Sequence, residues 1–157
     1  VDRKKELEAI KNKKLEIPFD NYPLQHAIKI NEGKGPYKVI YFADPYCGYC
    51  KKFDKEVISK LEDTTVYLFL YPILSEKSIN ASRDIYCSKN QAVAWIDFTI
   101  NSVVPASKNC KSPIEDILAF GKKMKIRGTP TLIFADGKRV PGALSYDQFR
   151  ELVQQTE

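Results

Sequence analysis

The sequence predicts a single α/β domain, and three features of the chain lead to that prediction. Two apolar runs of strand length, at 37–43 and 64–70, flank a stretch whose apolar residues follow helical spacing. A helical block follows at about 75–127, and then a short strand, a hairpin and a last helix. We expect the first strand–helix–strand unit to be parallel, with a right-handed crossover.

The composition is that of a globular protein and argues against several functional classes. The chain has 157 residues, of which 43% are hydrophobic and 29% charged, enough to bury a core without relying on disulfides. No run approaches the roughly 20 apolar residues of a membrane span, so we expect no membrane insertion. The net charge of +5 is modest, and no basic–aromatic pattern indicates nucleic acid binding. Because the chain begins at Val1, we expect a processed or trimmed product.

The amino-terminal third is expected to hold a helix and two strands. Residues 1–17 are charged with sparse apolar positions, which predicts a linker helix that ends before Pro18 and precedes a domain over 18–157. Residues 24–30 are predicted to form a short strand, followed by a glycine-rich turn. The run 37–43 is nearly all apolar, which is typical of a central strand buried on both faces.

The remaining elements are predicted from their start and stop residues. Ser75 is placed to cap a helix that reaches about Ser88, and residues 90–100 form a second helix with Trp95 in the core. Residues 112–115, Ser-Pro-Ile-Glu, match a capping box with proline at the first helical position. A strand that begins at Pro130 and runs to Ala135 leads into a two-residue Asp-Gly hairpin at 136–137, and residues 145–148 match a second capping box.

The chemistry of the chain is expected at two cysteines, Cys47 and Cys50, which lie between the strand at 37–43 and the following helix. This position puts Cys47 at a helix N-terminus, where unpaired N–H groups and the helix dipole favour a negative charge. A free thiol has a pKa of roughly 8.5, which such a position lowers. Cys47 is therefore the candidate attacking sulfur, and the more buried Cys50 is the candidate resolving sulfur.

Zinc binding and a purely structural bridge are the alternatives for this pair. A zinc site needs two further ligands, which are usually a second close-spaced pair. The other cysteines, Cys87 and Cys110, lie far apart, and His26 is the single histidine. We therefore expect thiol–disulfide chemistry, with no metal and no cofactor.

Cys87 and Cys110 are left over once the local pair is assigned, so a bridge between them is the favoured pairing. Closing that loop would stabilise the fold by roughly 3 to 3.5 kcal/mol in the chain-entropy model. A persistent bridge of this kind implies an oxidising compartment. The alternative is that both remain buried free thiols.

These motifs together resemble the catalytic domain of the DsbC/DsbG family of periplasmic disulfide isomerases, which has a thioredoxin-like fold. The resemblance extends from about residue 24 to residue 153. Four stretches carry it: Phe42–Lys51 with its Cys-Gly-Tyr-Cys motif, Phe69–Leu74, Ile85–Lys89, and Gly128–Phe134 with its Gly-Thr-Pro motif. In this family the block at about 75–127 is a helical insert in the thioredoxin-like fold, and the helix at 1–17 is a linker.

The resemblance implies a role for each motif. Cys47 would form a mixed disulfide with substrate, and Cys50 or a substrate thiol would resolve it. Thr129 and Pro130 would form a cis peptide facing the cysteines, where the Thr129 backbone pairs with an extended substrate. Tyr46 and Tyr49 would flank the bound polypeptide. The Cys87–Cys110 bridge would be structural.

The resemblance also implies partners and a location. Substrates would be unfolded or wrongly disulfide-bonded exported proteins, in the periplasm of a Gram-negative bacterium. A membrane thiol reductase of the DsbD type would keep the cysteines reduced. The family's N-terminal dimerisation domain has no counterpart here, so we expect a monomer as given and a homodimer where that domain is present.

One position departs from the pattern of thioredoxins, and two other functions compete with the isomerase interpretation. Thioredoxins place a buried acid six residues before the first cysteine, where this chain has Tyr41, and the nearby Asp44 is as suited to capping the turn as to moving protons. A monomeric dithiol oxidase and a chaperone-like peptide-binding module remain the competing functions.

Overall fold

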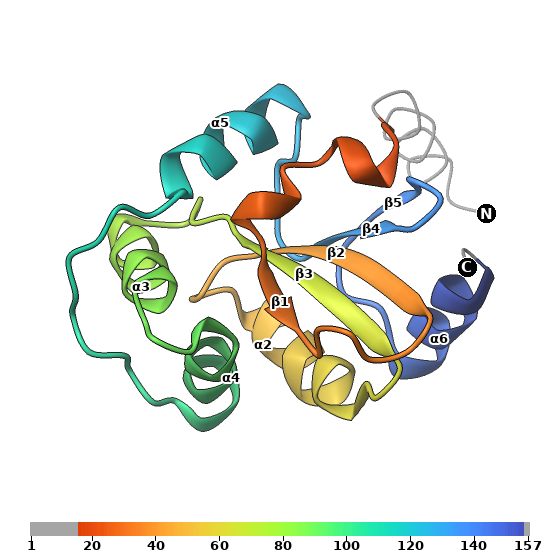
Figure 1. Ribbon diagram of the computed structural model, residues 1–157, viewed down its shortest axis with the longest axis horizontal. Helices are drawn as coiled ribbons and strands as arrows, with labels where there is room; N and C mark the ends of the chain where they lie inside the picture. The colour runs from red at the N-terminus through yellow and green to blue at the C-terminus, as the bar shows by residue number, and fades with distance from the viewer. Residues whose placement is uncertain (1–15, 156–157) are drawn as a thin grey trace.

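The computed structural model describes residues 16–155, arranged as a five-stranded sheet with helices on both faces (Figure 1). The strand order is β1-β3-β2-β4-β5. The strands are β1 Ile28–Ile30, β2 Tyr37–Ala43, β3 Thr64–Leu70, β4 Thr131–Phe134 and β5 Arg139–Pro141. The α-helices are α2 Gly48–Glu56, α3 Glu76–Tyr86, α4 Gln91–Asn101, α5 Ile114–Lys123 and α6 Tyr146–Gln155. Short 3-10 helices are η1 Phe19–Asn21, η2 Leu24–His26 and η3 Ile58–Lys60.

The two central strands have the bounds and direction expected from their apolar runs. β2 pairs with β3 in parallel over its whole length, and β1 and β4 flank this pair in antiparallel directions. The last five residues of β2 are all buried, as in a strand covered on both faces. The thioredoxin-like α/β fold with a helical insertion is therefore confirmed.

Successive side chains of β2 point to opposite faces of the sheet, and each face carries aromatic residues against which helices pack. Tyr41 contacts Phe53 of α2 with ring centroids 5.2 Å apart, so α2 covers that face together with α6. Phe42 points to the other face, where it contacts Tyr22 and Tyr71. On that face α5 lies so close to Tyr71 that any side chain at Gly121 would clash with the ring. Figure 1 shows α5 on one side of the sheet and α2 with α6 on the other.

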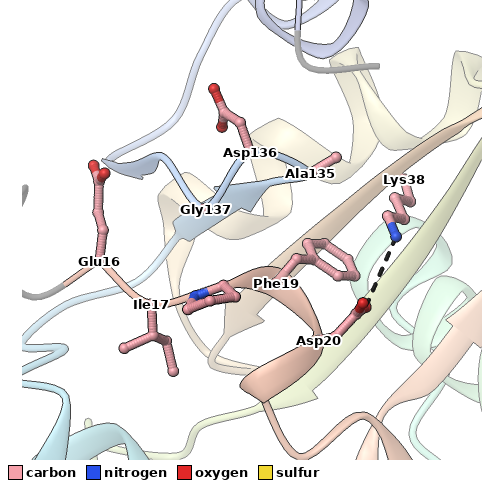
Figure 2. Close-up of a pocket in the computed structure, with 9 residues that line it drawn as sticks. Glu16, Ile17, Phe19, Asp20, Lys38, Ala135, Asp136 and Gly137 are labelled. Carbon is pink, nitrogen blue, oxygen red and sulfur yellow. Dashed lines mark ion pairs between the residues drawn. The ribbon is translucent and has the colours of Figure 1, made fainter.

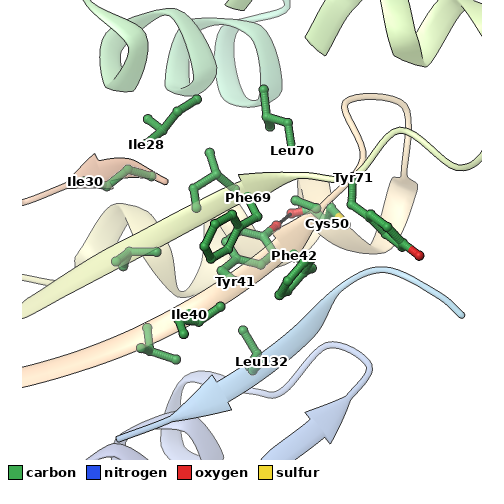
Figure 3. Close-up of a cluster of buried hydrophobic side chains, with 14 of the residues drawn as sticks. Ile28, Ile30, Ile40, Tyr41, Phe42, Cys50, Phe69, Leu70, Tyr71 and Leu132 are labelled. Atoms are coloured by element: carbon green, nitrogen blue, oxygen red, sulfur yellow. Dashed lines mark hydrogen bonds between the residues drawn. The ribbon is translucent and has the colours of Figure 1, made fainter. Parts of the chain in front are cut away.

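The core is a single cluster of buried side chains that reaches the cysteine site. Cys50 lies within this cluster, beside Tyr41 and close to the ends of β2 and β3 (Figure 3). Trp95 of α4 is fully buried, as predicted, because α4 packs against both α2 and β1. The helical insert therefore contacts the helix that carries Cys50.

The predicted strand over 24–30 is wrong for its first half. Residues 24–26 form η2, and only 28–30 pair with β3. The register would place His26 opposite Leu70, but the Tyr86 hydroxyl occupies that position. It accepts from the Leu70 N–H at 3.4 Å and donates to the His26 carbonyl at 2.9 Å. A tertiary contact thus ends the β-ladder two residues early.

Two helix boundaries differ from the sequence-based expectation. The stretch of helical spacing between the two central strands does not form one continuous helix: α2 ends at Glu56, Val57 leaves helical geometry with a φ of −121°, and Ile58–Lys60 form η3. Ser112 does not cap α5, since Pro113 itself occupies the N-cap position and no side chain caps the helix. Proline is tolerated there because that N–H has no helical partner.

The hairpin between β4 and β5 has three loop residues rather than the two expected. Phe134 pairs with Lys138 through a 3.0 Å hydrogen bond, and Gly137 donates to the Phe134 carbonyl at 2.9 Å. Gly137 has a φ of +88°, as in a type I turn followed by a left-handed residue. The second capping box is present as predicted: Ser145 and Gln148 each accept from the other's backbone N–H.

The linker helix predicted over residues 1–17 lies outside the described residues except for its last two. Glu16 and Ile17 belong to no helix or strand. The domain division at residue 17 therefore remains a prediction.

Candidate active site

Cys47 lies at the junction of β2 and α2, where its sulfur caps the helix. The residue has an extended backbone and occupies the N-cap position of α2. Its sulfur accepts a hydrogen bond from the Cys50 backbone N–H at 3.1 Å. Because a helix N-terminus carries a partial positive charge, this arrangement favours the thiolate form of Cys47.

A loop from the opposite part of the chain completes the surroundings of Cys47. The peptide between Thr129 and Pro130 is cis, and the Cys47 thiol donates to the Thr129 carbonyl at 3.4 Å. The two residues are 82 positions apart in sequence. The fold therefore brings the two predicted motifs, Cys-Gly-Tyr-Cys and Thr-Pro, into contact.

The two sulfurs differ sharply in proton affinity. The pKa of Cys47 is lowered from 9.0 to about 6, first because the Cys50 thiol can hydrogen-bond to its thiolate. Burial opposes this shift in pKa, and the Thr129 side chain and the N–H groups of Cys50 and Tyr49 add to it. Burial raises the pKa of Cys50 far above its ordinary value, and the neighbouring Cys47 adds to that shift. Cys47 is 7% exposed and Cys50 is fully buried, so one sulfur can attack and the other stays protonated.

The pH dependence of alkylation gives a first prediction. The rate of Cys47 modification by iodoacetamide should follow a single titration with its midpoint at about pH 6. At pH 7 about nine-tenths of Cys47 is then thiolate. Peptide mapping by mass spectrometry measures the rate for each cysteine separately.

A Cys50→Ala variant is the matched control for this measurement. Because the Cys50 thiol is the largest cause of the lowered pKa, its removal should move the Cys47 midpoint toward 9. A wild-type midpoint near 9 would contradict the assignment of Cys47 as the attacking sulfur. An unchanged midpoint in Cys50→Ala would instead show that the helix N-terminus alone lowers the pKa.

Asp44 caps the turn that leads to the cysteines. Its carboxylate is fully buried and accepts from the Tyr46 N–H at 2.9 Å and from the Leu74 N–H at 3.0 Å. These two bonds tie the active-site turn to the chain after β3. Of the two roles considered for Asp44, the structure shows the capping one.

The two tyrosines of the motif differ in what surrounds them. Tyr49 is 72% exposed at the start of α2. Tyr46 is held by the helical insert: its ring packs edge-on against Phe98 at 5.4 Å, and the Lys77 ammonium lies 4.2 Å from its centroid. Tyr49 is therefore free to contact another chain, whereas Tyr46 is 39% exposed and already contacts Phe98 and Lys77.

One functional candidate was missed by sequence reasoning, namely Asp54 on α2. Its carboxyl is fully buried, although it lies one turn beyond Cys50 on a helix of mostly charged residues. Burial raises its pKa to about 8, against the lowering effect of the side chains of Thr99, Tyr41 and Trp95. The helical spacing in the sequence could have indicated this burial, because position 54 falls on the same helical face as Cys50 and Val57.

Cys87 and Cys110 form a disulfide, with Cα atoms 5.6 Å apart. The bridge joins the end of α3 to the irregular segment before α5. Cys87 is half-buried and Cys110 is exposed, in contrast to the buried pair at the active site.

A surface hollow elsewhere on the molecule is unrelated to the cysteines. It lies at the β4–β5 hairpin and the start of β2, the end of β2 opposite to Cys47 (Figure 2). Its lysine, Lys38, forms an ion pair with Asp20 at 3.9 Å and lies over the ring of Phe19.

Within residues 16–155, no group of three or more His, Cys, Asp or Glu residues could hold a metal ion. No helix in the same range is long and apolar enough to cross a membrane.

Comparison with known proteins supports the arrangement found here. The profile of a family described as a thioredoxin-like domain matches residues 24–157. The "Probable thiol:disulfide interchange protein DsbC" of Bordetella parapertussis is 41% identical over 132 residues, covering 84% of this chain and 47% of that protein. The thiol:disulfide interchange protein DsbC of Escherichia coli K12 is 30% identical over 121 residues, covering 74% of this chain and 50% of that protein.

A solved structure is also similar over most of the chain. The disulfide interchange protein from Neisseria gonorrhoeae matches with a TM-score of 0.80 and 32% identity, covering 85% of this chain and 96% of that one. The chain spans about half the length of the curated relatives that it matches. The resemblance inferred from the sequence motifs is thereby confirmed.

Proposed function

The chain belongs to the family of thioredoxin-like domains, and we propose on that premise that it catalyses thiol–disulfide interchange in polypeptides through Cys47 and Cys50. One observation carries the proposal: Cys47 combines a lowered pKa with the only partial exposure of the pair, beside the Cys50 N–H and the Thr129 carbonyl. A thiolate in that position is a nucleophile ready to attack a disulfide.

The reaction proceeds in two sulfur-exchange steps. The Cys47 thiolate attacks one sulfur of a substrate disulfide, which forms a mixed disulfide and releases the other substrate sulfur as a thiolate. Either Cys50 then attacks Cys47, which reduces the substrate and leaves a Cys47–Cys50 disulfide, or a second substrate thiol attacks, which regenerates Cys47. The second route rearranges the substrate's disulfides without net oxidation, and this is isomerisation.

The substrate is proposed to be an unfolded or wrongly disulfide-bonded exported polypeptide. Thr129 is half-buried beside Cys47, where an extended chain could pair with its backbone. Tyr49 is largely exposed at the start of α2, and Tyr46 is partly exposed. Tyr46, Tyr49, Thr129 and Pro130 are the proposed substrate-binding set.

The cellular setting is proposed from the similarity to DsbC proteins. Residues 1–17 would link the domain to a dimerisation domain, since the relatives are about twice as long as the matched part. The full protein would then be a homodimer in the periplasm of a Gram-negative bacterium. A membrane thiol reductase of the DsbD type would return Cys47 and Cys50 to the dithiol. The Cys87–Cys110 bridge agrees with an oxidising compartment.

Refolding of ribonuclease separates the isomerase from the oxidase alternative. The reduced domain should restore activity to scrambled, fully oxidised ribonuclease in a glutathione buffer. The oxidised domain should be a poor catalyst of disulfide formation in reduced ribonuclease. The opposite pattern would favour a dithiol oxidase, and activity in neither assay would contradict the proposed function.

A further inference from the structure

The contact between α2 and α4 buries a cluster of polar groups around Asp54. Eight buried side-chain nitrogen and oxygen atoms within residues 16–155 lack a hydrogen-bond partner, and four of them belong to this cluster. They are both carboxyl oxygens of Asp54, Nε1 of Trp95 and Oγ1 of Thr99. Native proteins leave few such atoms unpaired, so a concentration at one place calls for a functional explanation.

Asp54 lies one helical turn after Cys50, and both are fully buried on the same face of α2. Side chains at this spacing are neighbours on the helix surface, with Cβ atoms about 5–6 Å apart. Tyr41 of β2 connects the two residues. Its hydroxyl donates to the Cys50 carbonyl at 3.3 Å (Figure 3), and it is a hydrogen-bond neighbour of both the Cys50 and the Asp54 side chains.

The charged and titratable neighbours of Asp54 are few. One is Cys47, at the N-cap of α2, and another is Tyr41 of β2. Burial raises the pKa of Tyr41 well above its ordinary value, so its hydroxyl stays a hydrogen-bond donor. α4 contributes only the neutral donors Trp95 and Thr99. No ion pair within residues 16–155 reaches the Asp54 carboxylate.

We propose that Asp54 accepts the proton of the Cys50 thiol when Cys50 resolves the mixed disulfide on Cys47. This inference rests on the proposed function, since it concerns the second of its two steps. The Cys50 proton passes to the Asp54 carboxylate, and the Cys50 sulfur forms a bond to the Cys47 sulfur. The bond from Cys47 to the substrate breaks, and the substrate sulfur leaves as a thiolate with the electron pair. Asp54 then returns the proton to solvent or to that thiolate.

The negative charge of Cys47 makes this proton transfer depend on the stage of the reaction. Burial is the largest cause of the raised pKa of Asp54, and the Cys47 thiolate of the reduced protein raises it further. In the mixed disulfide Cys47 carries no charge, so the Asp54 carboxyl is more acidic at the step in which Cys50 must lose a proton. The side chains of Thr99, Tyr41 and Trp95 lower the pKa at both stages.

Stopped-flow oxidation by glutathione disulfide measures this step directly. At saturating glutathione disulfide, attack by Cys47 is fast and closure by Cys50 is a first-order phase. Trp95 is the single tryptophan and packs beside Asp54, so its fluorescence reports closure. Asp54→Asn should slow closure roughly 100-fold, the lower end of general acid–base effects. Attack by Cys47, read from the glutathione-dependent phase, should keep its rate.

Two further variants separate a proton-transfer role from a structural one. Glu56→Gln removes an exposed acid from the same helix and should leave closure unchanged. Asp54→Glu keeps a carboxyl and should restore closure at least in part. The wild-type closure rate should rise with pH through a carboxyl titration, and this rise should be absent in Asp54→Asn. Equal closure rates and equal pH profiles in wild type and Asp54→Asn would overturn the proposal.

Carboxyl carbon NMR gives a readout that does not depend on enzyme activity. The pKa of Asp54 should be lower in the Cys47–Cys50 disulfide form than in the dithiol form. The same Asp54 pKa in both forms would contradict an effect of the Cys47 charge on Asp54.

The ribonuclease and closure measurements fail separately. If closure depends on Asp54 but scrambled ribonuclease is not rearranged, isomerisation of polypeptides fails while the role of Asp54 in closure stands. If scrambled ribonuclease is rearranged but closure has the same rate in wild type and Asp54→Asn, the role of Asp54 fails while the proposed function stands.

Discussion

Replacing Cys47 with serine is expected to reduce insulin reduction by this domain to the uncatalysed background. A serine hydroxyl stays protonated at neutral pH and cannot form the mixed disulfide, so no later step can begin. Cys50→Ser should behave differently, because attack by Cys47 is intact and only resolution by Cys50 is lost. Turnover of insulin in dithiothreitol measures the first effect, and intact mass spectrometry detects the trapped mixed disulfide in the second.

The double variant Cys47→Ser/Cys50→Ser addresses the peptide-binding alternative. If both cysteines can be removed while suppression of polypeptide aggregation and all biological activity persist, the domain is a binding module. Full insulin reduction by Cys47→Ser would likewise remove Cys47 from the mechanism. Circular dichroism of each variant serves as the control for folding.

Removing the Cys87–Cys110 bridge is expected to lower the free energy of unfolding by about 3 kcal/mol. The bridge spans 23 residues, and the loss follows from the larger conformational entropy of the unbridged unfolded chain. The double variant Cys87→Ser/Cys110→Ser avoids leaving a reactive lone thiol. Urea unfolding of the variant and of the wild type, both with Cys47 and Cys50 reduced, measures the difference.

The catalytic rates should respond far less than the stability does. The bridge joins the end of α3 to the segment before α5, whereas Cys47 is held by β2, α2 and the Thr129 loop. Insulin reduction at a temperature well below unfolding should therefore stay within about twofold of wild type. A loss of stability below about 1 kcal/mol would contradict the loop-closure explanation.

The elements predicted best from the sequence are those that depend only on residues close together in the chain. β2 and β3 have the expected bounds because each is a mostly apolar run of strand length, with Asp44 directly after β2 and Asp63 directly before β3. Cys47 caps α2 as expected, because a strand that ends just before a helix places the first cysteine at the helix N-terminus. The Ser145–Gln148 capping box likewise depends only on residues three apart.

The elements that were mispredicted depend on contacts between distant parts of the chain. β1 loses its first half to the hydroxyl of Tyr86, which lies 60 residues from its partner His26. No local sequence pattern predicts that contact. The three-residue hairpin follows from the pairing of Phe134 with Lys138, a register that the Asp-Gly pair alone does not determine.

At the candidate active site, the burial of Asp54 likewise depends on a distant part of the chain. Its helical phase could be read from the sequence, but a buried carboxyl is costly and polar residues are normally placed on the exposed face. What buries Asp54 is α4, whose Trp95 and Thr99 face it from 41 and 45 residues away. The helical insert thus contributes to the surroundings of Cys50, although its sequence carries no catalytic motif.

Quantitative thiol trapping across a glutathione redox series distinguishes a redox-active Cys47–Cys50 pair from four structural cysteines. Each cysteine is alkylated at each redox ratio and assigned by peptide mapping. We expect Cys47 and Cys50 to titrate together and reversibly while the Cys87–Cys110 bridge stays closed. Simultaneous opening of both pairs, or a Cys47–Cys50 bridge that resists reduction, would contradict this expectation and would favour a structural role for all four cysteines.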